Sequence, residues 1–372
     1  MAGGLAGVGY RWQHSGPAPA PHAGAAPSRT QRTLLIQVRG VGGDALASAL
    51  LAADPRTQQA AVVLVPSRVV AEVPGSGPGP YGQALGRAGG AALSRSTLAD
   101  LLGVTVDGSW VLDRPVLSAL VDRVGGIDVD VDTDVIVTGA GGPVVAVPQG
   151  AGQRLSGAQA LAVLNYRVPG EDELAALPRL QRVVLALLAR LPAGSAALTR
   201  LLADLGPGSQ VSDAAVATGV LDGTRRDVAA DRATYQILPV LAVDGGGAAT
   251  YRLDVAGVNA LAARQLAASR LAGHAATGNR VLVLNQAGGV GLGQHIRDRI
   301  VSKGFVFVDS RNQTPFDRHR TVVVVFDTRP PTLAGAGRLA AALGLPAAPV
   351  QVSPRAQNIA DLIVIVGTDF RP

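Results

Sequence analysis

Three observations predict a mixed α/β chain of two domains. The 372 residues exceed the usual size of one domain, and a hydrophobic content of 48% is enough for packed cores. Short valine- and leucine-rich runs alternate with longer segments of helical periodicity. A small, polar stretch at residues 272–278 separates residues 31–271 from residues 279–372, whose order is βαββαβ.

Residues 1–30 form a tail rich in proline, alanine and glycine, which we expect to be disordered or a linker. The first nine residues are apolar, but a bilayer span needs about 20. Tyr10, Arg11 and Trp12 follow as residue types typical of membrane interfaces. Two explanations stay open: a soluble protein with a flexible tail, or a sequence that begins inside a membrane anchor.

Composition excludes several classes of site. The net charge of +6 comes almost entirely from arginine, since Lys303 is the only lysine, and no cluster combines aromatic with basic residues. We therefore expect no nucleic-acid binding. The absence of cysteine excludes disulfides, thiolate catalysis and cysteine-based zinc sites. The five histidines lie far apart, which argues against a histidine metal site.

The first elements follow from apolar runs and turn residues. A glycine-rich loop, RGVGGD at 39–44, lies between an expected strand and an expected helix and could cradle phosphate. It lacks the Walker lysine and the third Rossmann glycine. In chain order we expect a strand at 33–38, a helix starting near Ala45, strands at 60–66 and 69–73, and a flexible loop at 75–80.

The next segment contains two helices and two strands. Ser96 is the expected N-cap of a helix over 96–102, and two glycines end a helix over 114–124. A strand at 109–112 lies between these two helices, and another strand at 127–133 follows the second helix. In the strand at 127–133, Asp128, Asp130 and Asp132 share one face. A solvated strand face explains this better than a calcium or acid–base site.

Residues 155–191 contain two apolar helical segments joined by a loop at 168–173. Arg167 precedes this loop, and Arg179 and Arg182 follow it. The arginine fork suits phosphate, but charged helix ends are also ordinary, so both interpretations stay open. The domain is completed by helices at 197–205, 212–221 and 259–271 and by strands at 235–241 and 250–253 around a turn at 245–247.

The final part carries no catalytic constellation, and His295 lies on an expected helix surface. Its expected strands are 280–284, 305–309, 321–327 and 361–366, and its expected helices are 292–303 and 334–343.

Several ordered motifs resemble the LytR-CpsA-Psr family of bacterial envelope proteins. They are VPSRVVAEVPG at 65–75, YGQALGRAGG at 81–90, LVDRVGGIDVDV at 120–131, LSGAQALAVLNYR at 155–167 and PRLQRVVLALLARL at 178–191. VLNQAGGVGLGQHIRDRIVSKGF at 283–305 and DLIVIVGTDF at 361–370 resemble the LytR C-terminal domain. The first resemblance covers residues 33–271 and the second 279–370.

The resemblance implies a three-layer sheet-and-helix domain followed by the small βαββαβ domain. Family members are membrane-anchored on the extracytoplasmic face of the cell membrane, in the cell envelope. They transfer a glycopolymer from a polyprenyl pyrophosphate carrier to peptidoglycan. Arginines would neutralise the pyrophosphate, carboxylate-bound Mg²⁺ would assist the leaving group, and a pocket between sheet and helices would hold the lipid tail. The C-terminal domain could contact other envelope proteins.

Position by position, the resemblance assigns Asp44 to metal binding and catalysis. Arg167 and Arg179 are candidates for both catalysis and pyrophosphate binding. The further pyrophosphate candidates are Arg68, Arg182 and Gln181.

The charge cluster departs from the family pattern in several places. Arg39 stands where the first metal-binding aspartate is expected, Ser67 where an arginine is expected, and Asn165 where the first arginine of an R-x-R pair is expected. The R-x-x-R-Q motif fits best with Arg179 as its second arginine, which places Ala176 at the first. In that register the glutamine is replaced by Leu180.

Losing one preorganised charge contact costs about 10²–10³ in rate, so these changes predict weakened or lost transfer. The competing hypothesis is a non-catalytic protein that binds a polyprenyl-linked or cell-wall ligand, or a scaffold. A transcriptional regulator is a weaker alternative, because no basic recognition helix is evident. Convergence of Asp44, Arg68, Arg167 and Arg179 would favour a phosphate site. Dispersal, or salt bridges to Asp172 and Glu173, would favour the scaffold.

Overall fold

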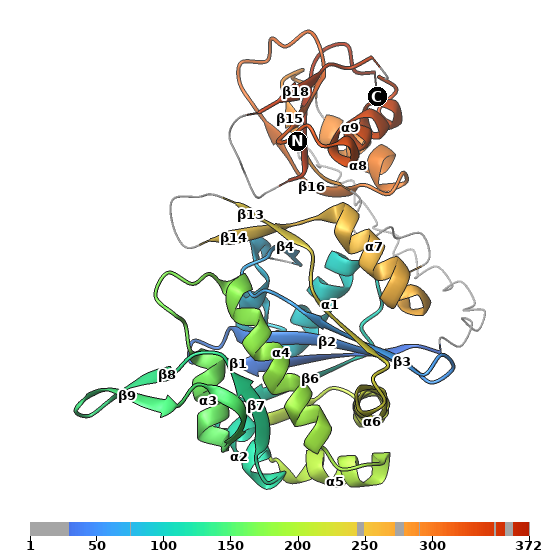
Figure 1. Cartoon of the computed structure of the whole chain (residues 1–372). Coiled ribbons are helices and arrows are strands. Elements are labelled where there is room, and N and C mark those ends of the chain that lie inside the picture. The colour runs from blue at the N-terminus through green and yellow to red at the C-terminus, as the bar shows by residue number, and fades with distance from the viewer. Residues whose placement is uncertain are drawn as a thin grey trace, which may run out of the picture.

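The computed structural model describes residues 30–74, 76–243, 249–271, 279–289, 291–345, 347–353 and 360–371. A large sheet-and-helix part is followed by a smaller one at the C-terminus (Figure 1). The tail expected at 1–30, except for its last residue Thr30, lies outside the described residues, as do the turn at 245–247 and the linker at 272–278.

A six-stranded sheet forms the centre of the large part, in the order β11-β6-β1-β2-β3-β12. The first two strands of the chain are β1 (Arg32–Arg39) and β2 (Ala45–Asp54), and they form an antiparallel hairpin. Strand β6 lies parallel to β1, so the carboxyl ends of these two strands meet at one edge. The other strands are β3 (Gln59–Leu64), β6 (Gly108–Asp113), β11 (Ser209–Val211) and β12 (Ala233–Ile237).

Helices cover both faces of the sheet and give three layers (Figure 1). One core joins alternate sheet residues, such as Leu34 and Leu51, to the covering helices. These are α2 (Arg114–Arg123), α3 (Gly157–Asn165), α4 (Glu173–Arg190), α5 (Ser195–Asp204) and α6 (Ala214–Ala229). The opposite core joins Leu35 and Leu50 to α1 (Gly90–Leu102) and α7 (Val255–Gln265).

No single helix among these described ranges is long and apolar enough to cross a membrane. The helices α4 and α5 reach that threshold only as a pair bent by 116°.

The helix expected from Ala45 is wrong, because this segment is strand β2. Alanine and leucine favour helices, but this preference is weak and tertiary packing overrides it. Both faces of β2 are buried, so the strand shows no alternation of apolar and polar residues. The loop at 39–44 is consequently a hairpin turn and does not lead into a helix.

Two of the expected local features differ in the structure. Ser96 is not an N-cap, since its hydroxyl donates to the Leu93 carbonyl inside α1, which begins after Gly89. Most of the loop expected at 75–80 is β5 (Gly77–Pro80), which pairs with β4 (Val70–Val73). A 3₁₀ helix (Tyr81–Gly86) follows, and another lies at Ala267–Ser269.

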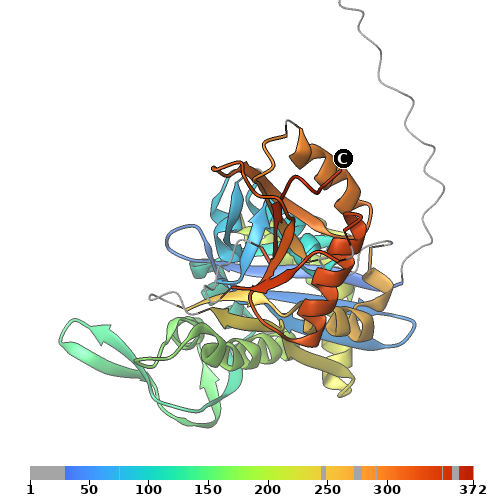
Figure 2. The same cartoon turned by 90° about the horizontal axis from the view of Figure 1, so that it is seen from above.

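An exposed hairpin of β8 (Val135–Gly139) and β9 (Gly142–Val147) was not expected from the sequence. It projects from the body of the large part (Figures 1 and 2). Beside it, β7 (Ile127–Val131) pairs with β10 (Gly150–Leu155). As expected, the aspartates of β7 are exposed and its valines are buried. The remaining pair is β13 (Val240–Val243) with β14 (Thr250–Leu253).

The C-terminal part confirms the expected βαββαβ order and adds one short strand. Its sheet has the order β16-β15-β19-β17-β18. The strands are β15 (Arg280–Asn285), β16 (Val306–Asn312), β17 (Val322–Val325), β18 (Val350–Val352) and β19 (Leu362–Val366). Its own core packs against α8 (Leu292–Val301) and α9 (Pro330–Ala342). An ion pair of 2.9 Å between Arg252 and Asp327 joins the two parts.

Candidate functional site

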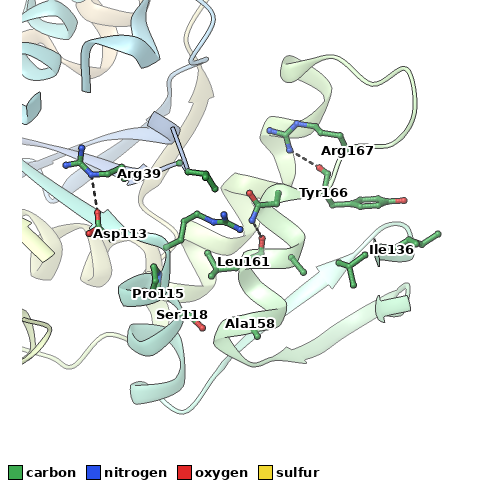
Figure 3. Close-up of a pocket in the computed structure, with 15 residues that line it drawn as sticks. Arg39, Asp113, Pro115, Ser118, Ile136, Ala158, Leu161, Tyr166 and Arg167 are labelled. Carbon is green, nitrogen blue, oxygen red and sulfur yellow. Dashed lines mark hydrogen bonds and ion pairs between the residues drawn. The ribbon is translucent and has the colours of Figure 1, made fainter. Parts of the chain in front are cut away.

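A groove of about 1060 Å³ lies at the carboxyl edge of β1 and β6. Open α/β sheets bind ligands outside the carboxyl ends of their strands. The turn after β1, the start of α2, strand β8 and helix α3 line the groove (Figure 3). Its apolar lining includes Val41, Ile136, Val137 and Leu161, and its cations are Arg39, Arg114 and Arg167.

At the groove, the charge of Arg39 is neutralised by Asp113, the last residue of the neighbouring strand β6. Parallel pairing sets Arg39 beside Asp113, and the Arg39 Nε donates to Asp113 Oδ1 at 3.1 Å (Figure 3). The Arg39 Nη1 also reaches the Gly43 carbonyl at 3.5 Å. Because a guanidinium lies here, the end of β1 provides no metal ligand.

Arg114 is a functional candidate that the sequence reasoning missed. It is the first residue of α2, directly after β6, and it lines the groove. Its Nε is buried and has no hydrogen-bond partner in the described part of the chain. A buried donor without a partner is costly, so Arg114 can gain from an anionic ligand. Its position directly after a strand is the sequence feature that could have identified it as a site residue.

Arg167 closes the end of α3 and reaches two hollows. Its Nη1 donates to the carbonyls of Leu164, at 3.2 Å, and Tyr166, at 2.8 Å (Figure 3 shows the latter). A cation is favourable at a helix C-terminus, so these contacts agree with a charged helix end, and the phosphate interpretation stays open. Partial desolvation, followed by the charge of Arg179, lowers its pKa, and Arg68 adds to this effect. These arginines therefore lie close enough to repel one another.

A second hollow of about 520 Å³, here called the side pocket, contains Arg68 and Arg167 together. Its lining also includes three acidic residues: Glu171 and Asp172 of the loop before α4, and Glu173, the first residue of α4. Arg68 and Arg167 are thus brought together as the sequence suggested. In this state they face carboxylates of the chain itself.

Arg179 is buried and paired with Glu171, and its Nε has no hydrogen-bond partner in the described part of the chain. Its Nη1 donates to Glu171 Oε1 at 2.9 Å, and its Nη2 makes a second, shorter contact with the same carboxylate. The Nη2 also donates to the Tyr166 carbonyl at 3.2 Å. The guanidinium is 6% exposed and the carboxylate 11%. Arg179 therefore anchors the loop, and the partner is Glu171 rather than the Asp172 or Glu173 considered from the sequence.

We expect this ion pair to make stability pH-dependent. The hydrogen bond from Arg179 is the main cause that lowers the pKa of Glu171. A lowered folded-state pKa contributes stability above the ordinary glutamate pKa of about 4.3. That contribution is lost as the pH falls through the lower folded-state value. Urea unfolding between pH 7 and pH 3 should show this loss in the wild type, and the variant Glu171→Ala should lack it.

The remaining sequence candidates lie outside this cluster. Arg182 pairs with Asp132 at 3.1 Å and donates to the Asp130 carbonyl at 3.3 Å, so it is directed to β7. Gln181 and Asp44 line neither the groove nor the side pocket. Asp44 is exposed at the start of β2, and its Oδ1 lies against Gly86, where an added Cβ would be 2.5 Å away.

Carboxylates are the side chains that would hold Mg²⁺ in this chain. Within the described ranges no group of three histidine, cysteine, aspartate or glutamate residues could hold a metal ion. Mg²⁺ is often bound by one or two carboxylates together with substrate phosphates. Asp44 is one such carboxylate, but it lines neither hollow and belongs to no cage built by the described residues. Its role in metal binding stays a prediction.

The space between the sheet and the helices is too small for a lipid tail. The apolar cavity there measures about 40 Å³, and its lining includes Trp110, Leu180 and Val183. The Trp110 side chain is buried in this layer, and its Nε1 donates to Ser209 Oγ at 2.9 Å. An apolar ligand chain has room in the open groove and none in this interior.

Two family models match the sequence. Residues 48–202 match the LytR_cpsA_psr family, and residues 279–370 match the domain described as LytR cell envelope-related transcriptional attenuator. The chain therefore contains a LytR-CpsA-Psr family region followed by a LytR C-terminal domain. A search of curated proteins found no matching relative.

Solved structures share the fold of the large part. Bacillus subtilis TagV is 14% identical, with a TM-score of 0.54, over 65% of this chain and 98% of TagV. Bacillus subtilis TagT is 17% identical, with a TM-score of 0.52, over 66% of this chain and 94% of TagT. A structure of TagT bound to LIIa-WTA gives 17% identity and a TM-score of 0.54, over 65% of this chain and 92% of that chain. These likenesses confirm the expected mixed α/β fold.

Proposed function

We propose that the chain binds a polyprenyl-pyrophosphate-linked glycopolymer at the extracytoplasmic face of the membrane, with weakened or lost transfer to peptidoglycan. The groove carries this proposal, because it combines cations with an apolar wall in one hollow. Arg114 and Arg167 would contact the pyrophosphate, and Val41, Ile136 and Leu161 would contact the lipid. The LytR-CpsA-Psr family region and the solved TagT complex support a glycopolymer as ligand.

Weakened transfer follows from the charges at the groove. Arg39 places a cation, already paired with Asp113, at the end of β1. Arg179 is occupied by Glu171, and Asn165 donates to the Leu161 carbonyl at 2.8 Å inside its own helix. Electrostatic stabilisation of the transition state requires charges aimed at the reacting group. Few such charges remain available here.

Binding of polyprenyl pyrophosphate in detergent micelles tests this proposal. The wild type should bind, and Arg114→Gln should weaken binding by about tenfold or more, since a charged hydrogen bond contributes about 1.5–3 kcal/mol. Arg200→Gln is a matched control, because Arg200 is exposed on α5 and lines neither the groove nor the side pocket. Equal affinities for both variants, or no binding by the wild type, would refute the proposal.

The role of Mg²⁺ is measured in the same assay. If Asp44 holds an ion that also contacts the ligand, Mg²⁺ should tighten wild-type binding and leave Asp44→Asn unchanged. An equal response of both proteins to Mg²⁺ would remove Asp44 from the site.

A further inference from the structure

Three donors of the turn after β3 converge on one carboxylate. The backbone N–H of Ser67 donates to Glu173 Oε1 at 2.6 Å, and the N–H of Arg68 donates to Glu173 Oε2 at 3.0 Å. The Ser67 hydroxyl makes a third, shorter contact with Oε1. Successive backbone N–H groups in a turn form concavities that bind anions. The carboxylate thus occupies an oxyanion position that the turn itself creates.

Contacts that do not involve Glu173 hold this turn in place. The Ser67 carbonyl accepts a hydrogen bond from the Gly82 N–H at 2.8 Å, and the Arg68 carbonyl accepts one from the Tyr251 N–H at 3.2 Å. An added Cβ on Gly82 would lie 2.8 Å from the Ser67 Cβ, so the two segments are in close contact. The N–H groups should therefore keep their direction when the carboxylate leaves.

The carboxylate belongs to the segment that also neutralises Arg179. Glu173 is the first residue of α4, and Glu171 lies two residues before it in the loop. One short segment thus supplies a carboxylate to Arg179 and another to the Ser67–Arg68 turn, and both positions could otherwise bind a phosphate. Arg68 and Arg167 line the side pocket beside it, and no ion pair to the Arg68 side chain is found within the described ranges. Cations and N–H groups therefore surround a position that a carboxylate now fills.

We propose that the Ser67–Arg68 turn is an oxyanion-binding site for a phosphate or pyrophosphate group, and that Glu173 occupies it until the ligand displaces it. The identity of the natural ligand rests on the function proposed above. A phosphate offers oxygens to the same three donors and gains the charges of Arg68 and Arg167. Competition with Glu173 lowers the apparent affinity in proportion to the fraction of molecules whose site is open.

Binding of inorganic pyrophosphate tests this competition without the lipid. Calorimetry should show that Glu173→Gln binds about tenfold more tightly than the wild type, since neutralisation raises the open fraction. Asp172→Asn is the matched control. It removes one negative charge from the same pocket, asparagine remains a good N-cap for α4, and Asp172 does not contact Ser67 or Arg68. The control should change the affinity much less than Glu173→Gln does.

The variant Glu173→Asp distinguishes displacement of the carboxylate by pyrophosphate from a general effect of the negative charge at this position. Aspartate keeps the charge but is one methylene shorter, so it cannot satisfy both N–H groups as glutamate does. Displacement predicts tighter pyrophosphate binding by this variant, whereas a pure charge effect predicts no change. Adding Ser67→Ala to Glu173→Gln should weaken binding again, because it removes one donor. Amide resonances of Ser67 and Arg68 should shift during the titration.

Two results would overturn the inference: an affinity gain for Glu173→Gln no larger than that for Asp172→Asn, or unchanged amide resonances of Ser67 and Arg68 at saturation. Failure of the proposed function is distinguishable from failure of this site. If pyrophosphate responds to Glu173 and the polyprenyl ligand does not bind, the oxyanion site stands and the proposed function falls.

Discussion

Glu171→Ala is expected to destabilise the protein by about 3–5 kcal/mol, because it leaves a buried charge without its partner. Arg179 lies on α4, where the packed helix holds its guanidinium in place, and its side chain is 6% exposed. The Tyr166 carbonyl at 3.2 Å and the Tyr166 ring, 5.8 Å from the guanidinium carbon, compensate part of the loss. We therefore expect a value near the lower end. Urea unfolding at pH 7 measures it.

The double variant Glu171→Ala/Arg179→Met is the control for this prediction. Replacing a whole buried ion pair by apolar side chains is often neutral or stabilising. The double variant should therefore recover much of the lost free energy of unfolding. A double variant as unstable as Glu171→Ala would show that the loop, and not the unpaired arginine, causes the loss.

Trp110→Ala is expected to cost about 3–5 kcal/mol, the usual range for removing a large aromatic side chain from a core. The side chain is 1% exposed and lies between the sheet and α4, at the wall of the 40 Å³ cavity. Its loss leaves the Ser209 hydroxyl without the indole donor and enlarges a space lined only by apolar residues. Thermal or urea unfolding measures the change.

The enlarged cavity offers a second measurement on Trp110→Ala. Empty apolar cavities stay dry and bind small apolar molecules such as benzene. Benzene should therefore raise the stability of Trp110→Ala and leave the wild type unaffected. A loss below about 1 kcal/mol without benzene binding would show that the surrounding leucines collapse into the space.

Local signals explain which parts of the fold the sequence could predict. The α3 helix begins with a capping box between Ser156 and Gln159, and α2 ends before two glycines with positive φ angles, Gly125 and Gly126. Such signals act within a few residues. Strand β2 lacked them, because its burial on both faces depends on strands and helices that approach from elsewhere in the chain.

The sequence suggested Arg68 and Arg167 of the two hollows, but neither Arg114 nor the pairing of the charged residues. Arg39 and Asp113 are 74 residues apart, and the parallel register of β1 with β6 brings them together. Glu171, Asp172 and Glu173 follow one another at the start of α4, yet nothing in this sequence shows that Glu171 pairs with Arg179 and that Glu173 binds the Ser67–Arg68 turn. These pairings depend on how the loop folds back onto two separate elements.

In the function proposed here, the chain binds its ligand without transferring it efficiently. Expression in a strain that lacks its own transferases, with an anchored active family member as the positive control, tests this claim most directly. The wall glycopolymer attached to peptidoglycan is measured. We expect the chain to leave attachment at the level of the deficient strain, while the purified protein still binds polyprenyl pyrophosphate. Attachment restored to the level of the positive control would contradict it.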